Sequence, residues 1–366
     1  MSGPVHLASL SATPLSVATV DPFVIATGKA HATRSVLVQV QLKRGGKTAE
    51  GLGEGSCLPP VTREDQPQAL EAVLRSRSTL VGSMWDDTAR MGQDLDAILA
   101  HWPVARAAVE VAILDAWAKL DGLPLYQWLG GPRVSPLLET DITLPILPVA
   151  RMLELARQWW GKGFRSFKVK VGKSLREDLL VLRGLVREFP DMRLRLDGNA
   201  GQSPEDALTI IRELYASHAF LECYEQPCAV LGDCARVVKD LEVPVVLDES
   251  VKHVSELKVA LTHGAATGVN LKIAKSGGIL EALAVGKAAA HAGISVMVGG
   301  MLETRLGMAA ATHLAAALGG ADFCDLDTAW LLETDPFLGG YEEDGPRYTV
   351  RSTPGLGVTL KGAVRR

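Results

Sequence analysis

From about residue 140 onward, short apolar runs alternate with longer segments whose apolar positions recur at helical spacing. The short runs predict strands, and the longer segments predict amphipathic helices. Strands are expected at residues 141–146, 167–171, 194–197, 221–225, 245–248, 269–273, 294–298 and 323–327. Helices are expected at residues 177–188, 204–216, 234–240, 255–263, 280–291 and 306–318. Ser203 followed by Pro204 is typical of the N-cap and first position of a helix.

Polar residues stand at the ends of several predicted strands. Asp197 and Glu225 are 28 positions apart, Glu225 and Asp248 are 23 apart, and Asp248 and Lys272 are 24 apart. One strand–helix unit per roughly 25 residues, repeated eight times, takes about 200 residues, which is close to a (β/α)8 barrel. A doubly wound sheet would also alternate. However, no G-x-G-x-x-G or G-x-x-x-x-G-K-[ST] motif in the sequence supports a nucleotide-binding sheet, so we favour the barrel.

The first 130 residues have a different pattern. An alternating run at residues 36–42 is followed by a turn signal at 44–47 and a second run at 49–53, which predicts a β-hairpin. Helical patterns follow at residues 66–75, 87–100 and 105–120. We therefore expect an α+β unit at residues 1–131 and the barrel at residues 132–335. The segment 336–366 is rich in glycine and proline, and we expect it to return to the first unit.

Composition narrows the class of protein. The chain has 366 residues, 47% of them hydrophobic, and 38 Lys and Arg against 42 Asp and Glu, a balance that argues against a nucleic-acid binder. No window reaches the roughly 20 apolar residues of a membrane span, and the first 20 residues contain no Lys or Arg of a signal peptide. The five cysteines form no C-x-x-C pair, which argues against a disulfide scaffold or a zinc site. A cytoplasmic protein is expected.

Two lysines on one predicted strand are candidates for acid–base chemistry. Lys168 and Lys170 are two positions apart, so on a strand they share one face. If that face is the barrel interior, mutual repulsion and burial lower their pKa values toward the range in which lysine acts as a base.

Three carboxylates end consecutive predicted strands, namely Asp197, Glu225 and Asp248. Converging carboxylates repel one another unless a cation neutralises them, and acidic oxygen ligands favour Mg²⁺. Lys272 falls roughly across the barrel from Lys170. A metal between two opposed lysines suits removal of a proton next to a carboxylate, with the second lysine returning a proton to the opposite face.

Each of these features also has an ordinary interpretation. A K-x-K pair is commonly a solvated strand edge, and a strand-end Asp is commonly a turn former or helix cap. The D-x-D pair Asp325 and Asp327 alone would more often be a cap or a salt-bridge partner. Because these features occur together on successive strands, we favour a functional site over these ordinary structural roles. We interpret His291, which precedes the seventh strand, as structural, and Met297 and Met301 as wall or core residues.

Several motifs resemble the enolase superfamily, in its muconate-lactonizing subgroup. They are G-L-G-E-G at 51–55, K-V-K-V-G at 168–172, L-D-G-N at 196–199, Y-E-Q-P at 224–227, L-D-E-S at 247–250, N-L-K-I-A-K-S-G-G at 270–278 and P-G-L-G-V at 354–358. The resemblance implies an α/β fold, a modified TIM barrel (β/α)7β with an α+β capping domain that the C-terminal tail completes. It also implies one Mg²⁺ per subunit on Asp197, Glu225 and Asp248. Lys170 and Lys272 would form the acid/base pair, with Lys168 beside them.

Within the subgroup, G-G-M-L-E-T at 299–304 and D-L-D-T at 325–328 are similar to the dipeptide epimerases. This similarity implies that Asp325 and Asp327 hold the ammonium group of a dipeptide, which two carboxylates on one strand face suit well. Thr143 and Met301 are further candidate substrate contacts.

Specificity is expected from capping-domain loops at about residues 21–34 and 53–60. Family members that act on Ala-Glu tend to carry an arginine after the Pro-Phe pair of the first loop. Here Gly28 takes that place with Lys29 beside it, so Lys29 is the candidate contact. This disfavours Ala-Glu and leaves hydrophobic or other dipeptides open.

The sequence thus predicts a dipeptide epimerase that inverts the α-carbon of the C-terminal residue by two-lysine 1,1-proton transfer through a metal-stabilised enolate. The alternative is a muconate cycloisomerase or an o-succinylbenzoate synthase-type lyase on the same scaffold. The D-x-D pair disfavours these and N-acylamino-acid racemisation, since none of those substrates carries an ammonium group. Acid-sugar dehydration would need a histidine near residues 298–300. A non-catalytic scaffold would not need this set of residues. A homo-oligomer with no nucleic-acid or membrane partner is expected.

Overall fold

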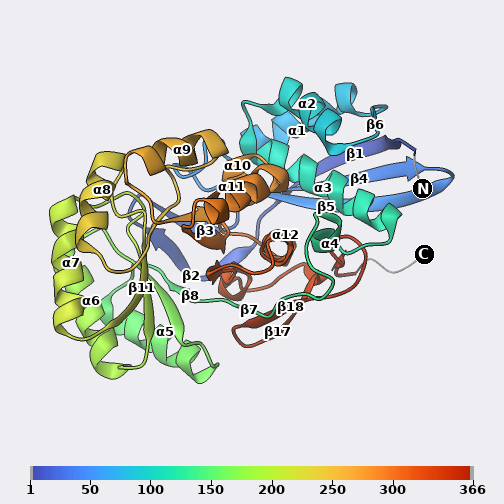
Figure 1. The fold of residues 1–366 in the computed structure, drawn as a ribbon. Helices are drawn as coiled ribbons and strands as arrows, with labels where there is room; N and C mark the ends of the chain where they lie inside the picture. Colours follow the sequence, from blue (N-terminus) through green and yellow to red (C-terminus); the bar gives the residue numbers. More distant parts are fainter. Residues whose placement is uncertain (1–2, 363–366) are drawn as a thin grey trace.

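In the computed structural model, which describes residues 3–362, eight parallel strands lie side by side in chain order (Figure 1). They are β8 (Ile142–Leu144), β9 (Ser166–Lys170), β10 (Arg193–Asp197), β11 (Phe220–Glu225), β12 (Val245–Leu247), β13 (Gly268–Leu271), β14 (Ser295–Gly299) and β15 (Phe323–Asp325). The Asp141 amide donates to the Cys324 carbonyl at 3.1 Å, so the segment before β8 returns to β15 and nearly closes the sheet. The predicted (β/α)7β barrel is confirmed.

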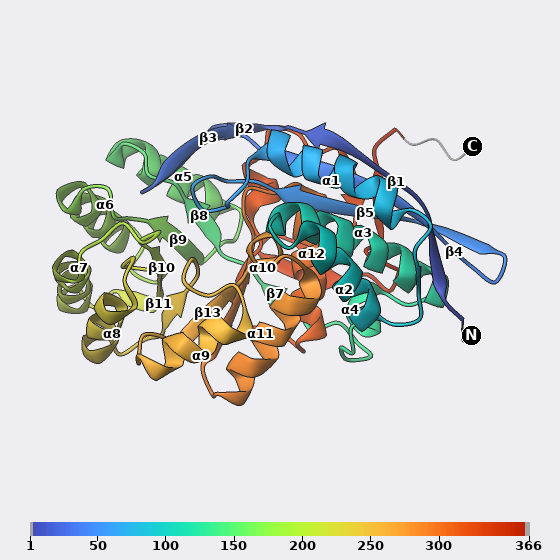
Figure 2. The ribbon, with the colours of Figure 1, turned by 90° about the horizontal axis from the view of Figure 1, so that it is seen from above.

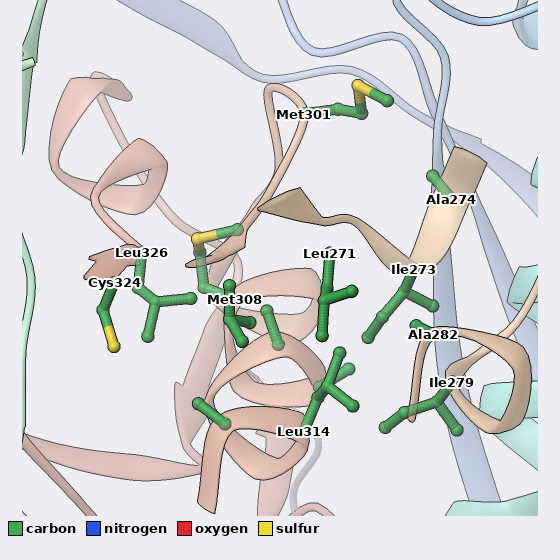
Figure 3. Close-up of a cluster of buried hydrophobic side chains, with 14 of the residues drawn as sticks. Leu271, Ile273, Ala274, Ile279, Ala282, Met301, Met308, Leu314, Cys324 and Leu326 are labelled. Atoms are coloured by element: carbon green, nitrogen blue, oxygen red, sulfur yellow. The ribbon is translucent and has the colours of Figure 1, made fainter. Parts of the chain in front are cut away.

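Helices connect the strands and cover the outside of the barrel. They are α5 (Val149–Gly161), α6 (Leu175–Glu188), α7 (Pro204–Ala216), α8 (Leu231–Asp240), α9 (Val254–Thr262), α11 (Ile279–His291) and α12 (Arg305–Ala317). The predicted N-cap is confirmed, because the Ser203 side chain accepts from the Asp206 amide. Figure 3 shows Leu271 of β13 and Leu314 of α12 pointing toward each other in the apolar layer between barrel wall and helix. Burial of this layer holds the strand ends in place.

The first part of the chain forms an antiparallel sheet with helices on one side. Within the described residues the sheet order is β5 (Lys47–Ser56), β4 (Ser35–Arg44), β1 (Val5–Leu15) and β6 (Met84–Trp85). The helices are α1 (Gln66–Leu80), α2 (Thr88–Leu99), α3 (Pro103–Asp121) and the short α4 (Leu125–Trp128). The predicted hairpin is the β4–β5 pair, with Arg44 opposite Lys47. The first strand was not predicted.

Strand β5 packs unusually close to helix α3. A Cβ atom added at Gly51 would lie 1.9 Å from the Ala112 carbonyl oxygen, and one at Gly53 would lie 2.1 Å from that of Ala108. Side chains alternate across a strand, so the opposite face of β5 remains free to meet the barrel. The glycines of the G-L-G-E-G motif thus allow the sheet to contact the helix directly.

A hairpin made of β2 (Ala18–Ile25) and β3 (Gly28–Ala32) reaches across to the barrel (Figure 2). The Val24 carbonyl accepts from the Ile146 amide at 2.9 Å, just after β8. Ala26 at the hairpin tip lies close to Gly172 and Gly201, in the loops after β9 and β10. This hairpin therefore lies over the carboxyl ends of the barrel strands.

The last part of the chain contacts both regions. After the 3-10 turn η1 (Thr328–Leu331), the strands are β16 (Phe337–Gly339), β17 (Tyr341–Asp344), β18 (Arg347–Val350) and β19 (Val358–Leu360). Strand β18 pairs with β7 (Leu138–Glu139), which precedes the barrel. The Leu356 amide donates to Asp115 Oδ1 of α3 at 2.6 Å. Among residues 3–362, the structure contains no helix with the length and apolar character that a membrane crossing requires.

Glu54 joins the sheet to the barrel. It is buried on the face of β5 opposite the glycines. Its carboxylate accepts from the Thr304 hydroxyl at 2.5 Å, the Thr304 amide at 3.1 Å and the Gly307 amide at 3.0 Å. These donors belong to the first turn of α12, where unpaired amides and the helix dipole favour a negative charge. Glu54 therefore caps a barrel helix from outside the barrel.

We predict that Glu54→Ala lowers the free energy of unfolding by about 1–3 kcal/mol, because buried amide donors lose their acceptor. Chemical denaturation followed by circular dichroism measures this change. The control is Glu50→Ala, which removes an exposed carboxylate from the same strand and should change stability by less than about 0.5 kcal/mol. Equal stability of the two variants would show that the Glu54 contacts do not hold the two parts together.

Candidate active site

Two lysines on β9 point into the mouth of the barrel. Every residue of β9 is buried, and Lys168 and Lys170 lie on its interior face. Lys168 Nζ lies 2.6 Å from Glu225 Oε2, 2.7 Å from Asp325 Oδ2 and 3.0 Å from Asp197 Oδ2. Lys170 Nζ lies 2.5 Å from Asp197 Oδ2. One ammonium group thus joins carboxylates from three different strands.

The three predicted strand-end carboxylates converge at the same edge of the barrel. Asp197 and Glu225 end β10 and β11 and stand opposite each other in the parallel register. Asp248 follows β12 directly. All three are buried, with no more than 1% of the residue surface exposed. The fold brings these side chains together because parallel strands present their carboxyl ends at one face.

Lys272 approaches from the other side of the barrel. It follows β13 and is the N-cap residue of the short helix α10 (Ile273–Ser276). Its Nζ lies 2.5 Å from Asp248 Oδ2 and 3.7 Å from Glu225 Oε1. Strand β13 is the fourth strand after β9 in the sheet order, so Lys170 and Lys272 face each other across the mouth.

The surrounding charges correct one expectation from the sequence. Burial by itself would lower the pKa of Lys168, but its three carboxylate partners outweigh burial and raise the pKa well above its usual value. For Lys272, burial is likewise outweighed by Asp248 and Glu225, which raise the pKa. The expected lowering of the Lys168 pKa was therefore wrong for this arrangement, because nearby carboxylates act more strongly than the neighbouring lysine.

The chemistry of the strand-end carboxylates fits Mg²⁺. Burial would raise the pKa of Asp197 and Asp248, but the adjacent lysines lower both well below their usual range, so these groups are ionised. Glu225 lies between them and accepts from Asn270 Nδ2 at 2.9 Å. Burial and the charge of Asp197 raise the pKa of Glu225. Carboxyl groups on three neighbouring strand ends, two of them held ionised by lysines, are the oxygen donors that Mg²⁺ prefers.

Sequence analysis missed several residues of this site. Asn270 shares a strand face with Lys272, so the two-residue periodicity could have identified it. The backbone amide of Asn199 donates to Asp197 Oδ1 at 2.9 Å. The position of Asn199 in the L-D-G-N motif was the feature of the sequence that could have identified it. Lys275 donates to Asp248 Oδ1 at 2.7 Å from within a helical turn, a contact that strand periodicity does not predict.

A small cavity lies above the lysines. Barrel residues form its floor and walls: Thr143, Lys168, Lys170, Asn199, Lys272, Gly300, Met301, Asp325 and Thr328. Four apolar side chains cover it, namely Phe23, Ile25, Leu58 and Val61. The cover comes from β2 and the loop after β5, so the cavity lies between the two parts of the molecule.

The structure does not bring Lys29 to this cavity. Lys29 stands opposite Val24 in the β2–β3 hairpin, and its side chain is exposed. Opposed residues point to the same face, so Lys29 lies on the face away from Phe23 and Ile25. The hairpin therefore presents apolar side chains to the cavity and its lysine to solvent.

Asp325 and Asp327 belong to a second carboxylate cluster beside the cavity. Asp327 is buried and its Oδ2 accepts from the Thr143 amide at 2.5 Å. Among the described residues, Asp141, Asp325 and Asp327 offer carboxylate oxygens within 4.8 Å of one another. Burial and the charge of Asp325 raise the pKa of Asp327 to about 7. Buried carboxylates this close to one another suit the binding of a positively charged group.

Comparisons with known proteins agree with this architecture. Residues 10–130 match the family described as mandelate racemase / muconate lactonizing enzyme, N-terminal domain. Residues 151–364 match the family described as enolase C-terminal domain-like. The L-Ala-D/L-amino acid epimerase of Populus trichocarpa is 35% identical over 353 residues, which cover 93% of this chain and 82% of that protein.

Solved structures show the same similarity. The substrate-liganded complex of the L-Ala-D/L-Glu epimerase from Bacillus subtilis has a TM-score of 0.91 at 30% identity, covering 97% of this chain and 99% of that chain. The dipeptide epimerase from Enterococcus faecalis V583, complexed with Mg and the dipeptide L-Leu-L-Tyr, has a TM-score of 0.90 at 30% identity, with the same coverage. The chain therefore belongs to the enolase superfamily, with the two-part architecture of its mandelate racemase/muconate lactonizing members, and it is an enzyme of the epimerase type.

Proposed function

We propose that this protein is a Mg²⁺-dependent dipeptide epimerase that inverts the α-carbon of the C-terminal residue. The observation that carries the proposal is that Lys170 and Lys272 line one cavity from opposite sides of the barrel. A carbon atom held between two such groups can lose a proton to one face and regain a proton on the other.

Asp197, Glu225 and Asp248 would hold the metal ion. When bound there, Mg²⁺ supplies positive charge next to the substrate carboxylate and stabilises the negative charge that develops as the α-proton leaves. The same carboxylates contact Lys168, Lys170 and Lys272 in this structure. Carboxylates engaged with a cation hold the protons of Lys168 and Lys272 less strongly, which brings the raised pKa values of these two lysines back toward those of a general base.

The two lysines then have equivalent roles. For one stereoisomer of the substrate, Lys170 Nζ accepts the α-proton and Lys272 Nζ donates a proton to the opposite face; for the other stereoisomer the roles exchange. Lys168 Nζ stays close to the carboxylates of Asp197 and Glu225 and neutralises their negative charge beneath the substrate. The apolar cover excludes water from the reacting centre.

Asp325 and Asp327 distinguish this proposal from lyase or cycloisomerase chemistry. A dipeptide carries an ammonium group, whereas the substrates of muconate cycloisomerase and o-succinylbenzoate synthase do not. Two buried carboxylates beside the cavity suit an ammonium group and would disfavour a purely anionic substrate.

The apolar cover also bears on substrate choice. Phe23, Ile25, Leu58 and Val61 would contact the side chain of the reacting residue, and Met301 lines the same cavity. Lys29, the cation that a glutamate side chain could use, lies on the other face of the hairpin. We therefore infer a preference for dipeptides with apolar side chains over Ala-Glu.

We predict that incubation with dipeptides in D₂O with Mg²⁺ introduces one deuterium at the α-carbon of the C-terminal residue, measured by mass spectrometry. Exchange should be faster for L-Ala-L-Phe or L-Ala-L-Leu than for L-Ala-L-Glu, and EDTA should abolish it. Absence of exchange with every dipeptide, together with turnover of muconate or a succinylbenzoate precursor, would establish the alternative reaction instead.

We predict that Lys170→Ala and Lys272→Ala each abolish net epimerisation, because each removes one of the two proton carriers. Each variant should retain α-exchange mainly with one stereoisomer, with opposite preferences and a loss of at least about 100-fold for the other stereoisomer. Deuterium incorporation into the separate L,L and L,D dipeptides measures this. Lys29→Ala is the control and should exchange like the unaltered protein. Equal residual epimerisation in both lysine variants would contradict the two-base mechanism.

A further inference from the structure

Asp141 is a buried carboxylate that neither the acid/base pair nor the metal ligands explain. It stands directly before β8, two positions from Thr143, which lines the cavity. No part of Asp141 is exposed. Together with Asp325 and Asp327 it forms a cluster of three carboxylates.

Each carboxylate of the cluster has one oxygen already engaged. Asp141 Oδ2 lies 3.0 Å from Arg195 Nη1. Asp325 Oδ2 lies 2.7 Å from Lys168 Nζ, and Asp327 Oδ2 accepts from the Thr143 amide at 2.5 Å. These contacts fix the orientation of all three groups and leave one oxygen of each for a ligand.

Two of the three remaining oxygens are buried and lack donors. Asp141 Oδ1 and Asp327 Oδ1 are buried, and neither has a hydrogen-bond partner among the described residues. Asp325, which keeps Oδ1, lines the cavity. A buried acceptor without a donor costs about 1–3 kcal/mol, so two such atoms in one cluster indicate that a donor-rich ligand belongs there.

We propose that Asp141 is a third carboxylate of the site that binds the substrate ammonium group, an inference that rests on the proposed dipeptide epimerase function. An ammonium group has three N–H donors, and the cluster offers three free oxygens, one from each carboxylate. Arg195 positions Asp141 for this contact, because it is itself fixed by the Cys324 carbonyl at 2.8 Å and by Glu222 Oε2 at 2.6 Å.

The carboxylates of the cluster lie close enough together for one small cation to contact all three. One oxygen from each of Asp141, Asp325 and Asp327 lies within 4.8 Å of the other two. Oxygens that accept from a tetrahedral ammonium group at about 2.8 Å lie roughly 4.6 Å apart, which falls within this limit.

The charges of the cluster agree with a cationic ligand. Burial and the neighbouring Asp325 raise the pKa of Asp141 well above its usual value, even though Arg195 opposes this effect. Arrival of an ammonium group favours the ionised carboxylates, so protons and substrate compete for the same oxygens. Since the pKa of Asp327 is raised to about 7, the KM for dipeptides should increase as the pH falls below about 7.

The test is Asp141→Asn, which keeps the size of the side chain but places an amide where the ammonium needs an acceptor. We expect the KM for a dipeptide such as L-Ala-L-Phe to rise about 10- to 100-fold, with kcat changed less than about threefold. N-propionyl-L-Phe, which lacks the ammonium group, serves as the second probe. Its exchange should be weak in the unaltered protein and unchanged in the variant.

Glu222→Gln is the matched control. It removes the negative charge of the other carboxylate partner of Arg195 but keeps a side-chain oxygen that can accept from Arg195 Nε. Arg195 therefore stays in place, no oxygen is removed from the cluster, and the KM for dipeptides should stay near that of the unaltered protein. If Asp141→Asn does not fold, Asp141→Ser removes the same oxygens with a smaller neutral side chain. Thermal melting of each variant shows which of them is folded.

Four results would overturn the inference. The first is an unchanged dipeptide KM in a folded Asp141 variant. The second is an equal rise in KM for the dipeptide and for N-propionyl-L-Phe. The third is the same rise in the dipeptide KM of Glu222→Gln. The fourth is a second Mg²⁺ per chain in calorimetric titration that is lost in Asp141→Asn. Each leaves the proposed epimerase function intact, whereas absence of exchange with any dipeptide in the unaltered protein would overturn both.

Discussion

Charged groups buried at the mouth of the barrel must be neutralised by one another or by a ligand, and the arrangement of the site follows from this constraint. An isolated buried charge is far more costly than a paired one. Lys168 helps to neutralise carboxylates from three strands, because its ammonium group contacts Asp197, Glu225 and Asp325. A residue at this position therefore links the candidate metal ligands to the candidate ammonium receptor.

The two faces of strand β5 connect this charged mouth to its cover. Gly51 and Gly53 allow one face to touch α3, while Glu54 on the other face caps α12. Ser56 on the same face donates to the Leu302 carbonyl at 2.8 Å, next to the cavity residue Met301. The alternation of side chains along one strand thus fixes the position of the apolar cover relative to the lysines.

The sequence predicted the barrel well because the strands are short apolar runs and several of them carry a polar residue at the carboxyl end. It predicted the first strand of the chain poorly, since Val5–Leu15 mixes Ser, Thr and Ala with few large apolar residues. The face of the hairpin on which Lys29 lies depends on the pairing register of β2 and β3. The order of residues along the sequence does not determine this register. Asp141 was assigned to a strand, but its partner Arg195 is 54 positions away. Contacts between residues so far apart in the sequence determine which carboxylates have a hydrogen-bond or charge partner, and the sequence pattern does not reveal them.

The contrast between the two carboxylate sets explains how one barrel mouth can receive two different positive charges. Asp197 and Asp248 contact lysines that hold them strongly ionised, as ligands for a small divalent cation must be. Asp141 and Asp327 instead have raised pKa values and free buried oxygens, because a single arginine and a backbone amide compensate them only in part. A site of this kind gains most from a ligand that brings both charge and N–H donors. The substrate ammonium group provides both, and its binding at this end of the cavity would fix the distance from the amino terminus to the carbon between the two lysines.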